Sequence, residues 1–477
     1  MSGKRWWIIV LIIFVIAMAF RLTLAVQDSE QTTGINNDNY YYYLEGYLIT
    51  EGHFFTEPSC MAELSPGQMA PIAQSYFNNP VLGNQLKSQV NLQANQFGIR
   101  PTQLCTVTTA EYPPMTPLVY AIPISLGFKA VNDVLYFVAL IGALTSVLMA
   151  IGARLAFGKG PGIIAGIITA ISPCFFGFDL RTMSEPIEQF FFAMLIAAIF
   201  LYVKKHTKPR ALLIGIALAF MILTRGEALV IGAVILAILF YMIGRKYELN
   251  IKEKLLHVGI ILCSTLLIMS PWLFLTYKQF GVPIVSIDGG SSLADSNSQF
   301  TYYGQSTGSW NAFNSSGANI PASRRYHHDL STFDQNQATS FILHHIGRWP
   351  VVVIDRVGRE YFVSYSSNQF NFVKDFENWR PWIIYAYAIS IWLTTIAALY
   401  GIILLRKDGK LQKVALLLGA ALGNYAILIF IYATPRVLAA SFVPMTLLAS
   451  VGVGGVISRI KKKSLINKPM HSETVEV

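Results

Sequence analysis

The chain contains a series of apolar runs, and several are about long enough to cross a lipid bilayer. A helix needs roughly 20 apolar residues to span a membrane, and runs near this length recur from one end of the sequence to the other. Of the 477 residues, 53% are hydrophobic and only 13% are charged, whereas a soluble domain has about 25% charged residues. We therefore predict an all-α polytopic membrane protein.

Charge decides how these runs are threaded. An ambiguous run at 115–131 is short and contains Pro117 and Pro123. If it does not span, every strongly basic link lies on one side, as the positive-inside rule requires of the cytoplasm. If it spanned, the basic link 204–210 would face outward, so we expect 115–131 to lie in the outer interface or to dip into it. The ten predicted spans are 6–26, 132–153, 161–178, 187–203, 211–225, 227–244, 255–276, 381–405, 413–433 and 437–457.

This topology places both termini in the cytoplasm and two long loops, 27–131 and 277–380, on the outer side of the cell (inner) membrane. The N-terminal run also has features of a secretory signal peptide, but it is long for one, so we expect a retained first helix. The net charge of +10 is explained by basic links that set topology. The lipid bilayer is therefore the expected partner, and no nucleic acid is predicted.

We divide the chain into four regions. Residues 1–276 form a transmembrane module that includes the first external loop, and 277–380 form the second external loop, with a role in acceptor recognition or closure. Residues 381–457 are the C-terminal transmembrane helices, and 458–477 are a disordered cytoplasmic tail. The arginines of the second loop that suit an anionic glycolipid or a phosphate are Arg324, Arg325, Arg348, Arg356 and Arg359.

Cysteine and histidine give weaker signals. Cys60 and Cys105 both lie in the first external loop, where a disulfide between them is plausible if that side is oxidising. The histidines of the second loop occur as two adjacent pairs, which point in different directions on a helix and show no further ligand spacing. No metal site and no cofactor are predicted, although the sequence leaves a divalent metal possible.

Asp38 begins a tyrosine-rich segment, "GINNDNYYYYLEGYLITEGHFF" (34–55). On a helix, Tyr40, Tyr43 and Tyr47 share a face that suits either the membrane surface or the helix bundle, while Asp38 and Tyr42 point elsewhere. One interpretation makes Asp38 only the N-cap of this helix. The other gives Asp38 a chemical role.

Other charged residues favour the second interpretation. Charges within a membrane are costly and usually face a cavity or a partner. Scattered helix caps would also explain them, but a shared outward-facing cavity explains their common side better. The charges predicted at the same depth as Asp38 are Arg21, Asp179, Arg181, Glu185, Glu188, Arg225, Glu227 and Arg436.

A carboxylate among arginines suits the transfer of a sugar from a lipid phosphate to a hydroxyl. The attacking hydroxyl needs a base, and the leaving phosphate gains negative charge that arginine binds bidentately. A helix bundle provides an opening to the membrane for the long lipid. Aromatic rings near the base suit the apolar face of a sugar.

At this point the sequence resembles the integral-membrane glycosyltransferases with the C-type fold (GT-C), which use polyprenyl-phosphate-linked sugars. The group includes protein O-mannosyltransferases, the lipid A aminoarabinose transferase, arabinosyltransferases and oligosaccharyltransferases. Matching segments run in the family's order through most of the chain, from the first span with Arg21 and the loop that opens on Asp38. The later ones are "YPPMTPLVYAIP" (112–123), the stretch 133–186 that ends in "RTMSEP", "LTRGEAL" (223–229) and "YATPRVLAASFVP" (432–444).

The resemblance implies a role for each matching residue. The acid of the first loop is the family's catalytic base and maps onto Asp38, and Glu185 matches a second acid that orients the base or the acceptor. We expect Arg181, Arg225, Glu227, Arg436, Tyr42 and Arg21 to bind substrate. The family's paired acids are here Asn37–Asp38, which weakens a metal-binding pair, and no Trp-Trp-Asp motif of oligosaccharyltransferases is present.

The leading hypothesis is an inverting enzyme that moves a single sugar from a polyprenyl phosphate to a cell-envelope glycan or glycolipid outside the membrane. A polysaccharide ligase or polymerase that uses a diphosphate donor and a protein O-glycosyltransferase are alternatives. A lipid-sugar flippase belongs to a different class. Against it stand the long external loops, the lack of inverted repeats and the gathering of charges on one side.

Overall fold

A computed structural model describes residues 3–28, 38–56, 58, 109–246, 250–311 and 328–466. All the secondary-structure elements of three or more residues in these ranges are helices. Each of the ten predicted spans overlaps a helix. These helices are α1 (Gly3–Asp28), α6 (Val131–Phe157), α7 (Lys159–Ile171), α9 (Glu185–Lys204), α10 (Lys208–Thr224), α11 (Ala228–Lys246), α12 (Ile251–Phe280), α18 (Pro381–Lys407), α19 (Leu411–Tyr425) and α20 (Phe442–Ile466). The all-α membrane fold is thereby confirmed.

The number of spans stays a prediction. Among the described residues, seven helices are long and apolar enough to cross a membrane: α1, α6, α9, α12, α18, α20 and α19 with the short 3₁₀ turn after it. The helices α7, α10 and α11 are shorter. Several helices differ in extent from the predicted spans: α12 continues past 276 to Phe280, α20 continues past 457 to Ile466, and α7 ends at Ile171, before 178.

The ambiguous run forms α5 (Met115–Ser125), a helix of 11 residues. At 1.5 Å per residue it is about 17 Å long, well short of the roughly 30 Å hydrocarbon core of a bilayer. Its length therefore agrees with the expectation that this segment lies at the interface or dips into it.

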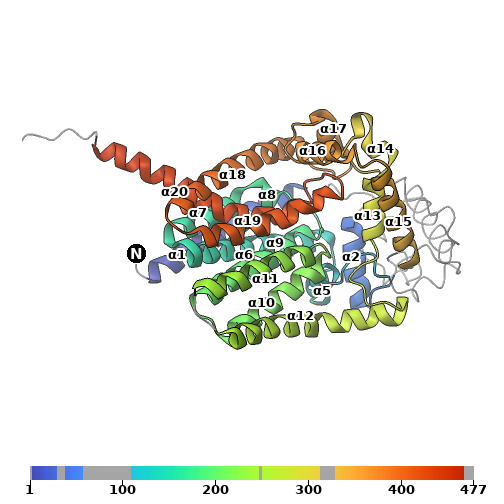
Figure 1. The fold of residues 1–477 in the computed structure, drawn as a ribbon, viewed down its shortest axis with the longest axis horizontal. Coiled ribbons are helices and arrows are strands. Elements are labelled where there is room, and N and C mark those ends of the chain that lie inside the picture. Colours follow the sequence, from blue (N-terminus) through green and yellow to red (C-terminus); the bar gives the residue numbers. More distant parts are fainter. Residues whose placement is uncertain are drawn as a thin grey trace, which may run out of the picture.

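Most of the shorter helices gather at one end of the bundle, while the start of α1 and the end of α20 lie toward the other end (Figure 1). The sequence predicts this separation of loops from termini. The helices of the loop end are α2 (Asp38–Thr50), α5, α13 (Gly289–Ser296), α14 (Gln299–Tyr302), α15 (His328–His344), α16 (Trp349–Glu360) and α17 (Ser366–Asp375). The short α8 (Pro173–Phe176) follows α7 within the bundle.

Two buried arginines hold the second external loop together, and Arg356 also fastens it to the bundle. Arg356 donates to the carbonyls of Ile429 at 2.9 Å and Ser296 at 2.6 Å, and Arg359 donates to that of Thr307 at 2.6 Å. Both side chains are at most 1% exposed. Their contacts correct the expectation that they bind an anionic lipid or phosphate, because their N–H groups face inward to backbone oxygens.

The helices α18 and α20 touch through their backbones. A Cβ atom added at Gly452 would lie 2.0 Å from the carbonyl oxygen of Ala397, and one added at Gly401 would lie 2.0 Å from that of Leu448. Small residues allow this close approach in membrane proteins. Glycine is costly inside a helix, so its presence at both positions is explained by the crossing.

Gly452→Ala should destabilise the protein and Gly454→Ala should not. The added methyl group at Gly452 meets a backbone carbonyl, and overpacking of this kind costs about 1–3 kcal/mol. A Cβ at Gly454 meets only Ile164, at an ordinary 3.5 Å, so alanine there should be neutral or stabilising by about 0.5–1 kcal/mol. Thermal unfolding in detergent compares the two variants, and equal midpoints would show that the crossing tolerates a side chain.

Candidate active site

The helix α2 delivers Asp38 to the site, and it is buried in protein rather than laid on the membrane. Tyr43, Tyr47 and Leu48 are at most 2% exposed, and the Tyr43 hydroxyl donates to the carbonyl of Lys129 at 2.6 Å. Of the two surroundings expected for the tyrosine face, the structure shows the bundle. A Cβ at Gly46 would lie 3.0 Å from the Pro117 carbonyl oxygen, so the lack of a side chain there lets α2 pack closely on α5.

Asp38 is the first residue of α2, and its carboxylate contacts side chains from two other segments. Its Oδ2 pairs with Nη1 of Arg436 at 2.6 Å, and its Oδ1 accepts a hydrogen bond from the Tyr112 hydroxyl at 2.9 Å. Asp38 keeps 28% of its side chain exposed. It is therefore more than a helix cap, and it remains accessible.

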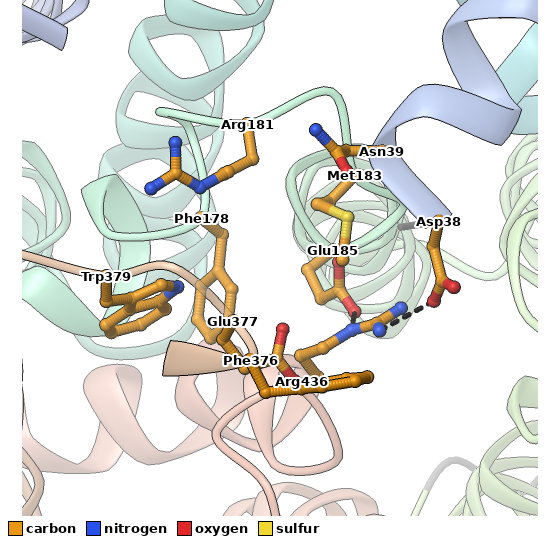
Figure 2. A pocket seen from close by; sticks show the side chains of 10 residues that line it. All are labelled: Asp38, Asn39, Phe178, Arg181, Met183, Glu185, Phe376, Glu377, Trp379 and Arg436. Atoms are coloured by element: carbon orange, nitrogen blue, oxygen red, sulfur yellow. Dashed lines mark hydrogen bonds and ion pairs between the residues drawn. The ribbon is translucent and has the colours of Figure 1, made fainter. Parts of the chain in front are cut away.

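Arg436 links two carboxylates. While its Nη1 pairs with Asp38, its Nε donates to Oε1 of Glu185 at 2.6 Å. Figure 2 shows the guanidinium between these two acids, which come from α2 and from the start of α9. The rigid plane of a guanidinium suits such a double contact, and it fixes the distance between Asp38 and Glu185.

Arg225 binds the same carboxylate of Glu185 as Arg436 does. Its Nη1 donates to the same Oε1 of Glu185 at 2.6 Å and to the Ser184 hydroxyl at 3.2 Å. Its Nε pairs with Glu227 at 2.6 Å and lies 3.6 Å from Glu188. One carboxylate oxygen of Glu185 thus holds two arginines, which orders both of them at the loop end of the bundle.

The Asp38 carboxylate is stabilised in its charged form. Burial by itself raises the pKa of Asp38, but the positive charge of Arg436, with hydrogen bonds from Arg436 and Tyr112, outweighs burial and lowers the pKa below its ordinary value. Asp38 is therefore ionised at neutral pH, ready to attract a proton or a cationic centre.

A pocket of about 470 Å³, including the space that opens to solvent, lies beside this arrangement. Carboxylates, guanidinium groups and aromatic rings meet on its walls (Figure 2), and a combination of aromatic walls with a few polar groups is typical of ligand pockets. The lining residues are Asp38, Asn39, Phe178, Arg181, Met183, Glu185, Phe376, Glu377, Trp379 and Arg436.

The structure separates the predicted site residues into groups. Asp38, Glu185, Arg181 and Arg436 line the pocket. Tyr42 is 2% exposed, with its ring 4.9 Å from that of Tyr112. Arg225 and Glu227 do not line this pocket and instead brace it through Glu185.

Arg21 lies away from the pocket. It is fully buried, and its Nε is 2.5 Å from Oδ2 of Asp179. Its other nitrogens donate to the carbonyls of Ala170 at 2.8 Å and Thr169 at 3.0 Å, at the C-terminal end of α7. The expectation that Arg21 binds substrate is corrected, because its guanidinium is used within the bundle.

Arg21→Ala should destabilise the protein without removing its affinity for a lipid phosphate. Breaking a buried ion pair by deleting one partner costs about 3–5 kcal/mol, because the other charge is left uncompensated. The double variant Arg21→Ala, Asp179→Ala should recover part of the loss. Thermal unfolding in detergent measures both effects, and weakened lipid-phosphate binding at unchanged stability would instead restore the substrate role.

Several residues near the pocket have no role that was predicted from the sequence. Glu377 and Trp379 line it from the segment between α17 and α18, which was assigned to the second loop without individual roles. Asp288 faces the same charges: burial raises its pKa to about 6, a hydrogen bond from Ser292 opposes this, and the negative charge of Asp38 adds to it. Glu377 could have been predicted from its position in the sequence, because it lies just before a predicted span, at the depth of the other charges.

Within the described ranges, no group of three or more His, Cys, Asp or Glu side chains is arranged to hold a metal ion. The structure describes Cys174 as a buried free thiol and Cys263 as an exposed one. The proposed disulfide partners Cys60 and Cys105 lie outside the described residues, as do Arg324 and Arg325.

Comparison with known proteins agrees with this architecture. The family described as dolichyl-phosphate-mannose-protein mannosyltransferase matches residues 111–274. The archaeal oligosaccharyltransferase AglB from Archaeoglobus fulgidus, in complex with an inhibitory peptide and a dolichol-phosphate, has a TM-score of 0.56 and 13% identity over 98% of this chain and 52% of that chain. No curated protein matches the chain.

Two further structures of the Archaeoglobus fulgidus oligosaccharyltransferase give similar values. The apo form has a TM-score of 0.55 and 13% identity, covering 96% of this chain and 52% of that one. The form tethered to an acceptor peptide has a TM-score of 0.53 and 14% identity, covering 98% and 51%. At this identity the likeness establishes the fold, and the chain spans about half the length of these structures.

The solved structures show that the chain has the fold of these membrane proteins, and the family match covers residues 111–274 of its 477 residues. The match to the mannosyltransferase family covers α5 to α12, which include Glu185 and Arg225.

Proposed function

We propose that the protein is an inverting glycosyltransferase that moves one sugar from a polyprenyl-phosphate donor to a hydroxyl of a cell-envelope glycan or glycolipid on the outer side of the membrane. The observation that carries this proposal is the contact of Arg436 with both Asp38 and Glu185 in the wall of a pocket. It joins a group that accepts a proton to a group that binds phosphate.

Arg436 and Arg181 are the cations that line the pocket, and we assign them to the donor phosphate. Arg436 is held by acids on two sides but keeps 15% of its side chain exposed, so an incoming phosphate competes with Asp38 for the guanidinium. Charge-assisted bonds of this type are about twice as strong as neutral hydrogen bonds. They strengthen further as the leaving phosphate gains charge, which is the condition for catalysis.

Asp38 is the proposed base. The acceptor oxygen forms its bond to C1 of the sugar while the bond from C1 to the phosphate oxygen breaks, and that electron pair leaves with the lipid phosphate. The proton of the acceptor hydroxyl passes to the Asp38 carboxylate, which positioned bases do in many enzymes. Attack on the face opposite the phosphate inverts the configuration at C1.

The acceptor has two candidates. We favour a glycan or glycolipid, while the description of the matched family favours a protein acceptor. Among the similar structures are complexes with dolichol-phosphate and with peptides, which is compatible with a lipid-linked donor and either acceptor. Product analysis with each acceptor class separates the two.

Asp38→Asn should lower the rate of sugar transfer at least a hundredfold, while folding and lipid-phosphate binding persist. The amide cannot take the proton, and removal of a general base typically costs 10²–10⁴-fold in rate. Transfer from polyprenyl-phosphate mannose, and from a panel of other sugars on the same lipid, measures the effect in the purified protein.

Asp375→Asn serves as the matched control for this substitution. It makes the same chemical change at a side chain that is 65% exposed, and its activity should equal that of the natural sequence. Full activity of Asp38→Asn would overturn the assignment of the base. Activity only with diphosphate donors would favour a ligase or polymerase, and lipid movement without a new glycosidic bond would favour a flippase.

A further inference from the structure

Glu377 is a second carboxylate in the pocket, and neither the family match nor the resemblance assigns it a role. It follows α17 and precedes α18, so it reaches the pocket from the second external loop, whereas Asp38 comes from the first (Figure 2). No described residue donates a hydrogen bond to its carboxylate. The charged and titratable groups that face it are Arg436, Glu185, Asp38, Arg181, Glu360 and Tyr432.

The backbone around Glu377 is firmly held. Arg181 donates to the carbonyl of Asn378, and the backbone N–H of Trp379 donates to the carbonyl of Val373 at 3.2 Å. The Trp379 ring packs against Phe178 at 5.3 Å and against Tyr387 at 5.5 Å. A carboxylate that is accessible from the pocket on a fixed backbone has the preorganisation required of a functional group.

The two carboxylates of the pocket have opposite surroundings. Asp38 forms an ion pair and a hydrogen bond, and its pKa is lowered. Burial raises the pKa of Glu377 to about 7; the charge of Arg436 opposes this rise, while those of Glu185 and Asp38 add to it. Pairs of acids whose environments separate their pKa values commonly divide proton transfer between them.

Resting on the function proposed above, we infer that Glu377 is the proton-carrying group of this pocket: as a carboxylate it takes up the proton released by the transfer step, and its later ionisation lowers the affinity for the lipid phosphate that remains in the pocket. The ionisation of Glu377 thus promotes release of the lipid phosphate product. The geometry carries this inference, because Glu377 lies beside the guanidinium groups assigned to the phosphate and lacks a bonding partner of its own among the described residues.

The proton balance is closed. The proton that Asp38 takes from the acceptor hydroxyl passes to Glu377, the group with the greater proton affinity, and Asp38 returns to its charged form. Loss of that proton to solvent then leaves a carboxylate beside the bound lipid phosphate. Repulsion between the two anions weakens phosphate binding and prepares the pocket for the next donor.

The sign of the pH dependence follows from linkage. A bound phosphate raises the pKa of Glu377 further, since a second anion disfavours the carboxylate. Binding is therefore strongest where Glu377 is protonated and weakens as the pH rises through 7. The lipid phosphate itself titrates near pH 6, but this contribution is the same in every variant.

The experiment measures the affinity of the purified full-length protein for undecaprenyl monophosphate between pH 6 and pH 8.5. The dissociation constant of the natural sequence should increase roughly three- to tenfold more over this range than that of Glu377→Gln, since each unit of pKa difference is a factor of ten. Asp375→Asn, two residues away and exposed, should behave as the natural sequence does. Calorimetry in buffers of different ionisation enthalpy should show proton uptake on binding above pH 7 that Glu377→Gln lacks.

Equal pH dependence and equal proton uptake in the natural sequence and in Glu377→Gln would overturn this inference and leave the proposed glycosyl transfer intact. If the natural sequence does not bind the lipid phosphate at any pH, the proposed function fails and the inference fails with it. A Glu377→Gln protein that unfolds is replaced by Glu377→Asp, which keeps the titrating group and should retain the pH dependence.

Discussion

The contact of one guanidinium with two carboxylates organises the loop end of this molecule. Arg436 comes from the segment between α19 and α20, Asp38 from the first external loop and Glu185 from the start of α9. Three distant parts of the chain are joined at distances of 2.6 Å. Charges buried at this depth are tolerated only when each is paired, so the positions of the surrounding helices are tied to this arrangement.

The arginines of the chain show that one residue type serves different purposes. Arg21, Arg356 and Arg359 are buried and bond to backbone carbonyls, where they join helices and loops. Arg436 and Arg181 keep a place on the pocket wall. Burial and partners, rather than the residue type or the depth in the membrane, separate the two groups.

Much of this architecture is predictable from the sequence, because the membrane imposes strong rules on length, hydropathy and loop charge. Asp38, Glu185 and Arg436 were expected at one site since each lies at the outer end of an apolar run. Glu377 was not, because its neighbours "DFENWR" carry no periodic pattern and its partners are distant in sequence. Arg21 was misplaced for the converse reason: depth in the membrane is visible in the sequence, but the direction of a side chain toward Asp179 is not.

The close crossing of α18 and α20 has a consequence for how residues of the pocket move relative to one another. Glu377 lies just before α18, and Arg436 lies in the segment that leads into α20. The two helices touch backbone to backbone at Gly401 and Gly452. No side chains lie between them there whose rearrangement would let one helix slide over the other. They should tilt together as a rigid body, so that any opening of the bundle moves Glu377 and Arg436 as one unit.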